Sequence, residues 1–171
     1  MALRPARCYH RMNKKAYTRV SIHKPRKSYV KGVPSIRIHQ FEVGKKGRYP
    51  LKFHLVSKND VQVRSNSLES ARIAAVRFLT KKLGAENFFF KVLVYPHHVL
   101  RENPMATGAG ADRFSEGMRR SFGKPIGQAA RIRKNQNVMM VNAPENSENV
   151  VKEALERSSS KLPGTYRIVS G

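Results

Sequence analysis

The residues that decide the fold are 88–95, FFFKVLVY, a run that stops at Pro96. Aromatic and β-branched side chains dominate this run, and such side chains favour a pleated, buried strand. Only Lys91 interrupts its apolar character. A run of this kind is typical of a strand inside a sheet, covered on at least one face. We therefore predict a central strand over these residues.

Two strands and a helix are expected before this central strand. Residues 36–43 begin with apolar and polar side chains in alternation, and residues 51–56 form a second such run. Apolar side chains then recur at helical spacing, with Asn66 or Ser67 as the cap and Gly84 as the stop. The buried stripe of this helix would consist of Leu68, Ala71, Ala75, Phe78 and Leu79.

The C-terminal part of the chain predicts a second set of the same elements. Residues 129–133 alternate small or apolar side chains with arginine, and residues 137–141 could pair with them across a turn at Asn135-Gln136. A helix should begin at residues 144–147 and end at Pro163-Gly164, and residues 166–169 could close the sheet. We therefore predict one α+β domain over residues 1–171, a mixed or antiparallel sheet with two helices packed on it.

A long loop region, residues 101–128, separates the two sets of elements. Its first half contains almost no bulky side chain, so little apolar area holds the backbone in place. Its second half combines glycine with arginine and lysine, which allows a backbone to approach a ligand closely beside positive charge. Long loops of this kind are usually functional or disordered. We predict a mobile, functional loop that contacts a phosphate-rich surface.

The charge of the chain points to a polyanionic partner. Lys and Arg total 34 against 11 Asp and Glu, a formal net charge of +23. Residues 1–50 hold fourteen basic residues and one acidic residue, Glu42. Nucleic acid is the usual partner of such a surplus, and an anionic membrane a less usual one. Residues 1–33 are expected to form a basic RNA-binding extension, because arginine beside tyrosine suits both phosphates and exposed bases.

Several other classes of protein fit the sequence poorly. Cys8 is the only cysteine, which excludes an internal disulfide and a thiolate zinc cluster. No apolar run approaches the roughly 20 residues of a membrane span, so a soluble, intracellular protein is expected. Neither the glycines at residues 108–113 nor the Gly123-Lys124 pair has the spacing of a nucleotide-binding loop. Adjacent His97 and His98 point to opposite faces of a strand, so they make a poor metal site. We expect no enzyme activity, no metal and no cofactor.

The sequence resembles a known family in several motifs. These are RPARCY at residues 4–9, GVP at residues 32–34, and the central run AGADR, GM, R, FGKP, G and AR between residues 109 and 131. Together they are similar to the large-subunit ribosomal protein called "ten-e" in archaea and eukaryotes, whose bacterial counterpart is protein sixteen. The resemblance extends from Arg4 to Pro163-Gly164 near the end of the chain.

This resemblance implies an α/β-hammerhead fold and no enzymatic activity. It also implies a cytoplasmic, ribosome-bound protein close to the peptidyl transferase centre, with ribosomal RNA, tRNA and neighbouring ribosomal proteins as partners. The family supports tRNA binding in the A and P sites, and the loop would extend toward the tRNA. The expected tRNA-proximal residues are Met105, Ala106, Thr107, Gly108, Ala109, Gly110, Ala111 and Asp112.

Candidate RNA-binding residues lie in the extension and around the loop, where charge and flexible backbone coincide. They are Arg4, Arg7, Tyr9, Arg11, Arg19, Arg26, Lys27, Arg113, Arg119, Arg120, Lys124, Arg131 and Arg133. An alternative is a basic DNA- or RNA-binding protein outside the ribosome, such as a chromatin protein. A membrane-active cationic protein would need a basic amphipathic helix with an unburied apolar face.

Overall fold

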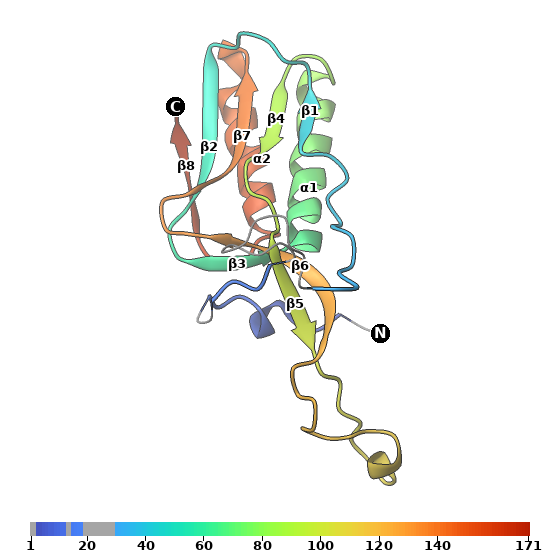
Figure 1. The fold of residues 1–171 in the computed structure, drawn as a ribbon. Helices are drawn as coiled ribbons and strands as arrows, with labels where there is room; N and C mark the ends of the chain where they lie inside the picture. Colours follow the sequence, from blue (N-terminus) through green and yellow to red (C-terminus); the bar gives the residue numbers. More distant parts are fainter. Residues whose placement is uncertain (1–2, 13–14, 19–29) are drawn as a thin grey trace.

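Two antiparallel sheets make up the fold of the computed structural model, which describes residues 3–12, 15–18 and 30–171 (Figure 1). Every strand pairing within them is antiparallel. The five-stranded sheet has the order β1 (Glu42–Gly44), β4 (Phe89–Val92), β7 (Asn137–Ala143), β2 (Leu51–Ser57), β8 (Tyr166–Ser170). The three-stranded sheet has the order β3 (Val61–Arg64), β6 (Lys124–Ile132), β5 (His98–Glu102).

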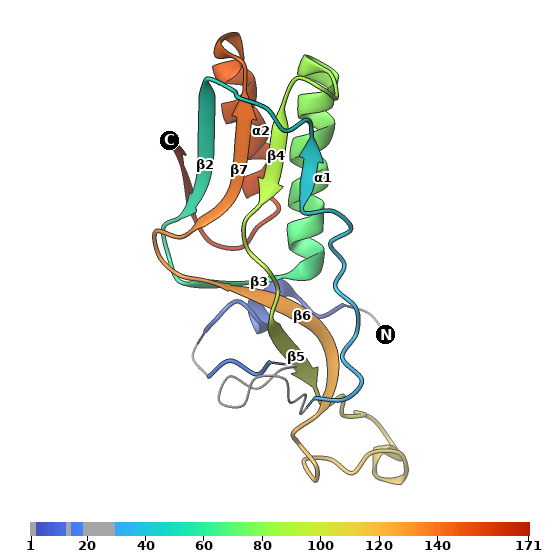
Figure 2. The same ribbon diagram turned by 45° about the horizontal axis from the view of Figure 1, so that its top comes forward.

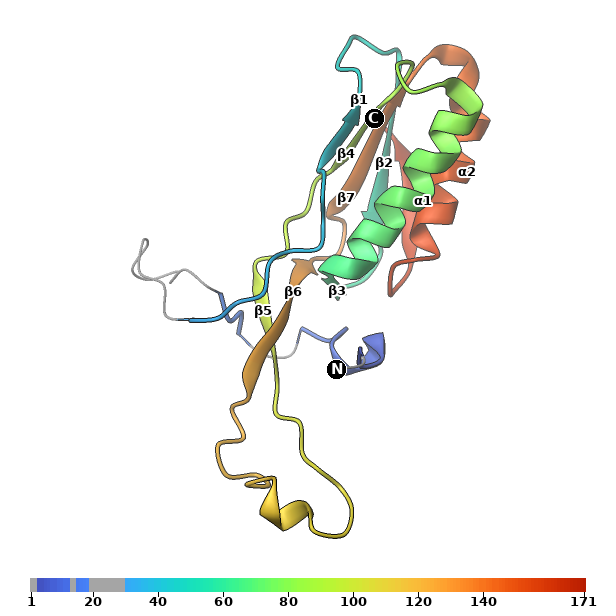
Figure 3. The same cartoon turned by 90° about the vertical axis from the view of Figure 1, so that its right-hand side faces the viewer.

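Two helices cover one face of the five-stranded sheet, as the side view shows (Figure 3). They are α1 (Ser65–Leu83) and α2 (Glu148–Ser159). The predicted apolar stripe of the first helix is buried in the core, together with alternate residues of the strands beneath it. Short 3-10 helices occur at Ala6–Cys8, Ala111–Arg113 and Glu145–Ser147. The α+β prediction with two packed helices is confirmed. None of the helices in the described ranges is both long and apolar enough to cross a membrane.

The central strand over residues 88–95 is confirmed as an interior strand, although it is shorter than predicted. β4 lies between β1 and β7, and the side chains of Phe88 and Phe90 are completely buried. Beyond Val92 the chain leaves the five-stranded sheet and leads into β5 of the smaller sheet (Figure 2). The two sheets are therefore linked directly by this stretch.

The pairing predicted between residues 129–133 and 137–141 is wrong. β6 pairs with β3 and β5, whereas β7 pairs with β2 and β4. The turn between them is bound to the end of β2 instead of closing a hairpin: Asn135 N–H donates to the Ser57 carbonyl (2.8 Å), and Ser57 N–H donates to the Gln136 carbonyl (3.1 Å). This attachment directs the two strands into different sheets.

Several element boundaries also differ from the predictions. The strand expected over residues 36–43 is reduced to β1, because the preceding chain is held by burial of Ile38 and by a hydrogen bond from His39 N–H to the Glu69 carboxylate (3.4 Å). β3 and β5 were not predicted. α1 begins directly after β3, so neither Asn66 nor Ser67 is its cap. α2 ends at Ser159, before Pro163-Gly164.

Candidate nucleic-acid interface

The N-terminal segment, residues 3–12 and 15–18, lies across the three-stranded sheet and joins both of its outer edges. At the β3 edge, Gln62 N–H donates to the His10 carbonyl (2.9 Å). At the β5 edge, Val99 N–H donates to the Tyr17 carbonyl (2.7 Å), and Thr18 forms an antiparallel bridge with His98. Backbone hydrogen bonds therefore fix the path of this segment at two points.

Side chains from one face of the same sheet hold the N-terminal segment between those points. Each makes a hydrogen bond to a backbone group of the N-terminal segment. The attachment therefore depends on the backbone path of the segment more than on the identity of the segment's side chains. The contacts are Gln62 Nε2 to the Tyr9 carbonyl (2.7 Å), Arg64 Nη1 to the Arg4 carbonyl (2.6 Å), Arg131 Nη2 to the Met12 carbonyl (2.9 Å), and Tyr17 N–H to His98 Nδ1 (2.9 Å). The opposite face contributes Val61, Val63, Ala130 and Ile132 to the core.

Tyr17, Arg101 and Phe122 form a clasp that joins the N-terminal segment to the base of the long loop. The Arg101 guanidinium carbon lies 3.7 Å from the centroid of the Phe122 ring and 4.8 Å from that of Tyr17. Arg101 Nη1 also donates to the Phe122 carbonyl (3.0 Å), and the two rings meet edge to face at 5.6 Å. Cation–π contacts of this kind contribute about 0.5–1 kcal/mol each at exposed sites.

The loop projects from the three-stranded sheet as a finger, residues 103–123, continuing the direction of β5 and β6 (Figures 1 and 3). Residues 104–122 are exposed, apart from half-buried Ala111 and Ser115. Phe122 at its base is held by the clasp. Contacts among the finger's own described residues include Ser115 N–H to the Ala111 carbonyl (2.9 Å) and Asn103 Nδ2 to the Gly117 carbonyl (3.3 Å). Residues 101–102 and 124–128, predicted as loop, are instead strand residues of β5 and β6.

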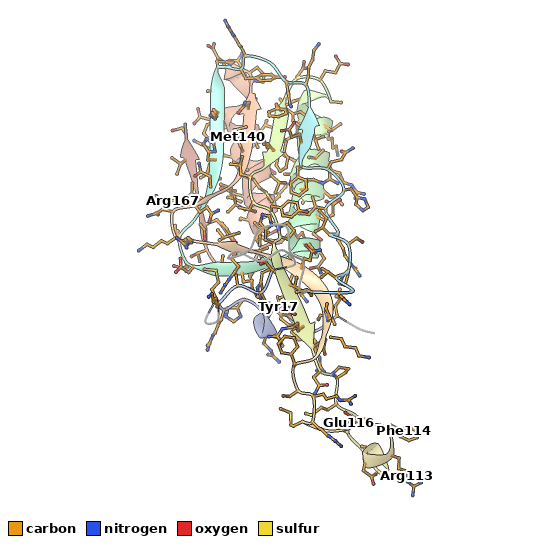
Figure 4. All side chains as sticks on the ribbon, viewed as in Figure 1. Tyr17, Arg113, Phe114, Glu116, Met140 and Arg167 are labelled. Atoms are coloured by element: carbon orange, nitrogen blue, oxygen red, sulfur yellow. The ribbon has the colours of Figure 1, made fainter. Side chains whose placement is uncertain are left out.

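Large apolar side chains are exposed at the end of the finger. Phe114 is 89% exposed and lies at the tip beside Arg113 and Glu116 (Figure 4). Met118 and Met105 are exposed as well, at 68% and 48%. Of these three residues, only Met105 was among those expected near tRNA. Phe114 and Met118 were not predicted, although a bulky apolar residue inside a loop without periodicity was an available signal. These side chains leave apolar surface available for a partner at the end of a cationic loop.

Most of the candidate RNA-binding residues fall into two groups, one in the N-terminal segment and one at the finger, and three lie outside the described residues. Arg131 and Arg133 belong to neither group: Arg131 is half-buried and donates to the Met12 carbonyl (2.9 Å). Arg7 and Arg11 in the N-terminal segment are exposed, as are the finger group and Arg133. Arg4 Nε instead pairs with Glu102 Oε1 (2.5 Å), and the Tyr9 hydroxyl donates to Glu102 Oε2 (3.5 Å). The finger group comprises Arg113, Arg119 and Arg120 in the finger, together with Lys124 at the adjoining start of β6. The residues outside the described ranges are Arg19, Arg26 and Lys27.

The largest cluster of acidic residues lies away from these two groups, although Glu116 pairs with Arg120 inside the finger (3.6 Å). Four of the eleven lie between residues 145 and 156, in and before α2. The pKa of Glu42 falls to about 2, because Lys46 and then Lys91 donate hydrogen bonds to its carboxylate. Since 34 basic residues face only 11 acidic ones, internal ion pairs cannot neutralise the positive surface. Among the described residues, no three His, Cys, Asp or Glu side chains converge to hold a metal ion.

Comparison with known proteins shows the family of the chain. The family model for ribosomal protein L16p/L10e matches residues 17–169. The chain belongs to the ribosomal protein L16p/L10e family. It is 48% identical to the large ribosomal subunit protein uL16 of Methanococcus aeolicus, over 100% of this chain and 95% of that protein. The uL16 proteins of Staphylothermus marinus and Archaeoglobus fulgidus are 46% and 41% identical, over 99% of this chain and 94% and 93% of theirs. The resemblance seen in the sequence motifs is confirmed.

Gly123, at the base of the finger in this family member, tolerates no side chain. Its φ is +76°, and an added Cβ would lie 2.6 Å from the carbonyl carbon and oxygen of Glu102. Gly123→Ala should therefore destabilise the protein by about 1–3 kcal/mol, measured by denaturant unfolding. Gly127→Ala is the matched control, since Gly127 has open space around it. Equal stability of the two variants would contradict the close approach of the two backbones.

His98 should make the attachment of the N-terminal segment sensitive to acid. Burial, and then the charges of Arg131 and Arg101, lower its pKa from 6.5 to about 4. Between these values the unfolded chain binds a proton that the folded chain does not, so stability is full above about pH 6.5 and falls as the pH drops toward 4. His98→Asn keeps an acceptor for Tyr17 N–H but cannot titrate. Denaturant unfolding at about pH 7 and about pH 4.5 should show a smaller acid-induced loss in this variant than in the wild type; equal losses would exclude His98 as the cause.

Proposed function

We propose that this protein is a structural constituent of the large ribosomal subunit, where it binds ribosomal RNA near the peptidyl transferase centre and supports tRNA binding in the A and P sites. The observation that carries the proposal is the coincidence of a projecting, cationic finger with membership of a ribosomal protein family over the whole chain. The family is of a structural, non-enzymatic kind. We infer a cytoplasmic, ribosome-bound protein with neighbouring ribosomal proteins as further partners.

RNA would be bound through its phosphates and its shape. Exposed cations of the N-terminal segment and of the finger lie on the same half of the molecule, around the three-stranded sheet. Arginine recognises phosphate with two parallel hydrogen bonds, and glycine in the finger lets the backbone come close to a ligand. The exposed apolar tip, with Phe114, offers a surface for stacking or packing that this chain leaves uncovered. The protein would bind and orient the RNA, and it would exclude water from the contact surface.

Co-sedimentation tests the proposal against the alternative of a free nucleic-acid-binding protein. A tagged copy expressed in source cells should migrate with large subunits in a sucrose gradient and remain there after a moderate salt wash. A chromatin protein would instead pellet with DNA and be released by DNase. Recovery of the chain away from large subunits, with or without DNA, would overturn the proposed function.

A further inference from the structure

A cavity of about 420 Å³ lies between the N-terminal segment and the three-stranded sheet. The N-terminal segment contributes Arg11, Lys15 and two tyrosine rings to its walls, and the sheet contributes Arg101 and Arg131. Its volume is within the range of small-molecule sites, roughly 300–1,000 Å³, and is far too small for an RNA helix. Tyr17, one of the lining residues, is labelled beside β5 in Figure 4.

The charge of this cavity is of one sign. Four cationic side chains line it, and none of the described residues that line it is acidic. The nearby Glu102 carboxylate is engaged by Arg4. His98, which also lines the cavity, has its pKa lowered to about 4 by burial and by Arg131 and Arg101, so it adds a neutral wall at neutral pH. Such a cavity favours an anionic group, because an anion reduces the mutual repulsion of the four cations.

Two of the four cations are held in fixed positions. Arg131 is hydrogen-bonded to the Met12 carbonyl (2.9 Å), and Arg101 packs against the rings of Phe122 and Tyr17. A fixed guanidinium loses little side-chain entropy when it binds phosphate. The guanidinium groups of Arg131 and Arg101 are therefore preorganised for binding an anion. Arg11 and Lys15 are exposed and line the cavity from the side of the N-terminal segment. Tyr9 and Tyr17 add apolar ring surface, on which an unpaired base can stack.

From this geometry we infer that the cavity binds one unpaired nucleotide of RNA, with its phosphate among the four cations and its base against the tyrosine rings. The inference rests on the proposed function, because it takes RNA as the source of the nucleotide. A nucleotide bound here would also contact Arg101, and through the clasp it would fix the N-terminal segment to the base of the finger.

Cys8 provides a direct test, because it is the only cysteine of the chain, is exposed, and lines the cavity. The rate of its alkylation by iodoacetamide in the purified full chain should report whether the cavity is filled. The probes are an RNA hairpin with a one-nucleotide bulge, the same hairpin fully paired, adenosine monophosphate, and inorganic phosphate. Each is used at ten times its own dissociation constant, so that about one protein in eleven remains unoccupied.

The bulged hairpin should slow alkylation by about tenfold, the factor set by this occupancy. The paired hairpin should give little protection, since its binding to other cations leaves the cavity open. Equal protection by both hairpins, or by neither, would overturn the inference. Full protection by adenosine monophosphate or phosphate, without protection by the bulged hairpin, would assign the cavity to a small ligand and would also overturn it.

Variants separate the cavity from general positive charge. Arg11→Gln combined with Lys15→Gln should abolish the difference between bulged and paired hairpins. Arg77→Gln combined with Lys81→Gln removes the same charge from exposed positions of α1 and should leave that difference intact. If both double variants behave alike, the inference fails. If Cys8 in assembled large subunits is alkylated as fast as in the free protein, the inference is refuted and the proposed function still stands. If the protein fails to join the subunit, the proposed function itself is refuted.

Discussion

Replacement of residues 104–121 by a two-residue Asn-Gly turn should leave the fold intact and impair tRNA binding by the ribosome. The strands at the base of the finger are paired as far as Glu102 and Lys124, so a short hairpin turn can close the gap. The removed residues contribute nothing to the core cluster. Stability should therefore stay within about 0.5 kcal/mol of the wild type, as for changes at exposed positions.

The functional effect of the same change should be large. Subunits that contain the shortened protein should bind tRNA about tenfold or more weakly, the result of losing contacts worth about 1.4 kcal/mol. Filter binding of labelled tRNA to purified subunits measures this effect. Phe114→Ala keeps the finger backbone and should give a smaller loss, because it removes only the exposed ring at the tip. Loss of cooperative unfolding would show that the finger is structural, and undiminished tRNA binding would show that it does not reach tRNA.

The elements that local sequence determines were predicted from the sequence. The strand at residues 88–95 and the helix ended by Gly84 have strong apolar periodicity, and Gly84 adopts a φ of +84° at the helix end as its position predicted. The partition of strands between two sheets was not predictable in this way. It depends on hydrogen bonds between Ser57 and the turn at Asn135-Gln136, which are distant in sequence and mostly use backbone groups.

In the candidate site, too, local features could be predicted from the sequence and contacts between distant residues could not. The cationic, glycine-containing loop could be predicted, because the absence of bulky residues is a local property. The attachment of the N-terminal segment could not, because Gln62 and Arg131 bind backbone carbonyls that every residue possesses. Arg4 illustrates the consequence: it was expected to contact RNA, and in the structure it pairs with Glu102. Whether Arg4 binds RNA in the assembled subunit remains a prediction.

Binding of the purified protein to its ribosomal RNA should weaken steeply with salt, by about 10⁴–10⁵-fold between about 50 and about 200 mM. The reason is release of counterions when exposed cations of the N-terminal segment and the finger contact phosphates; about ten contacts would give a slope of roughly −7 to −9 for log affinity against log salt concentration. Arg7→Gln and Arg119→Gln, at exposed positions in the two groups, should each make this slope shallower by about 1. Arg77→Gln, on α1, is the matched control and should leave the slope unchanged. Because burial of apolar surface depends little on salt, a slope near −2 for the wild type would mean that packing, and not phosphate contact, holds this protein to RNA.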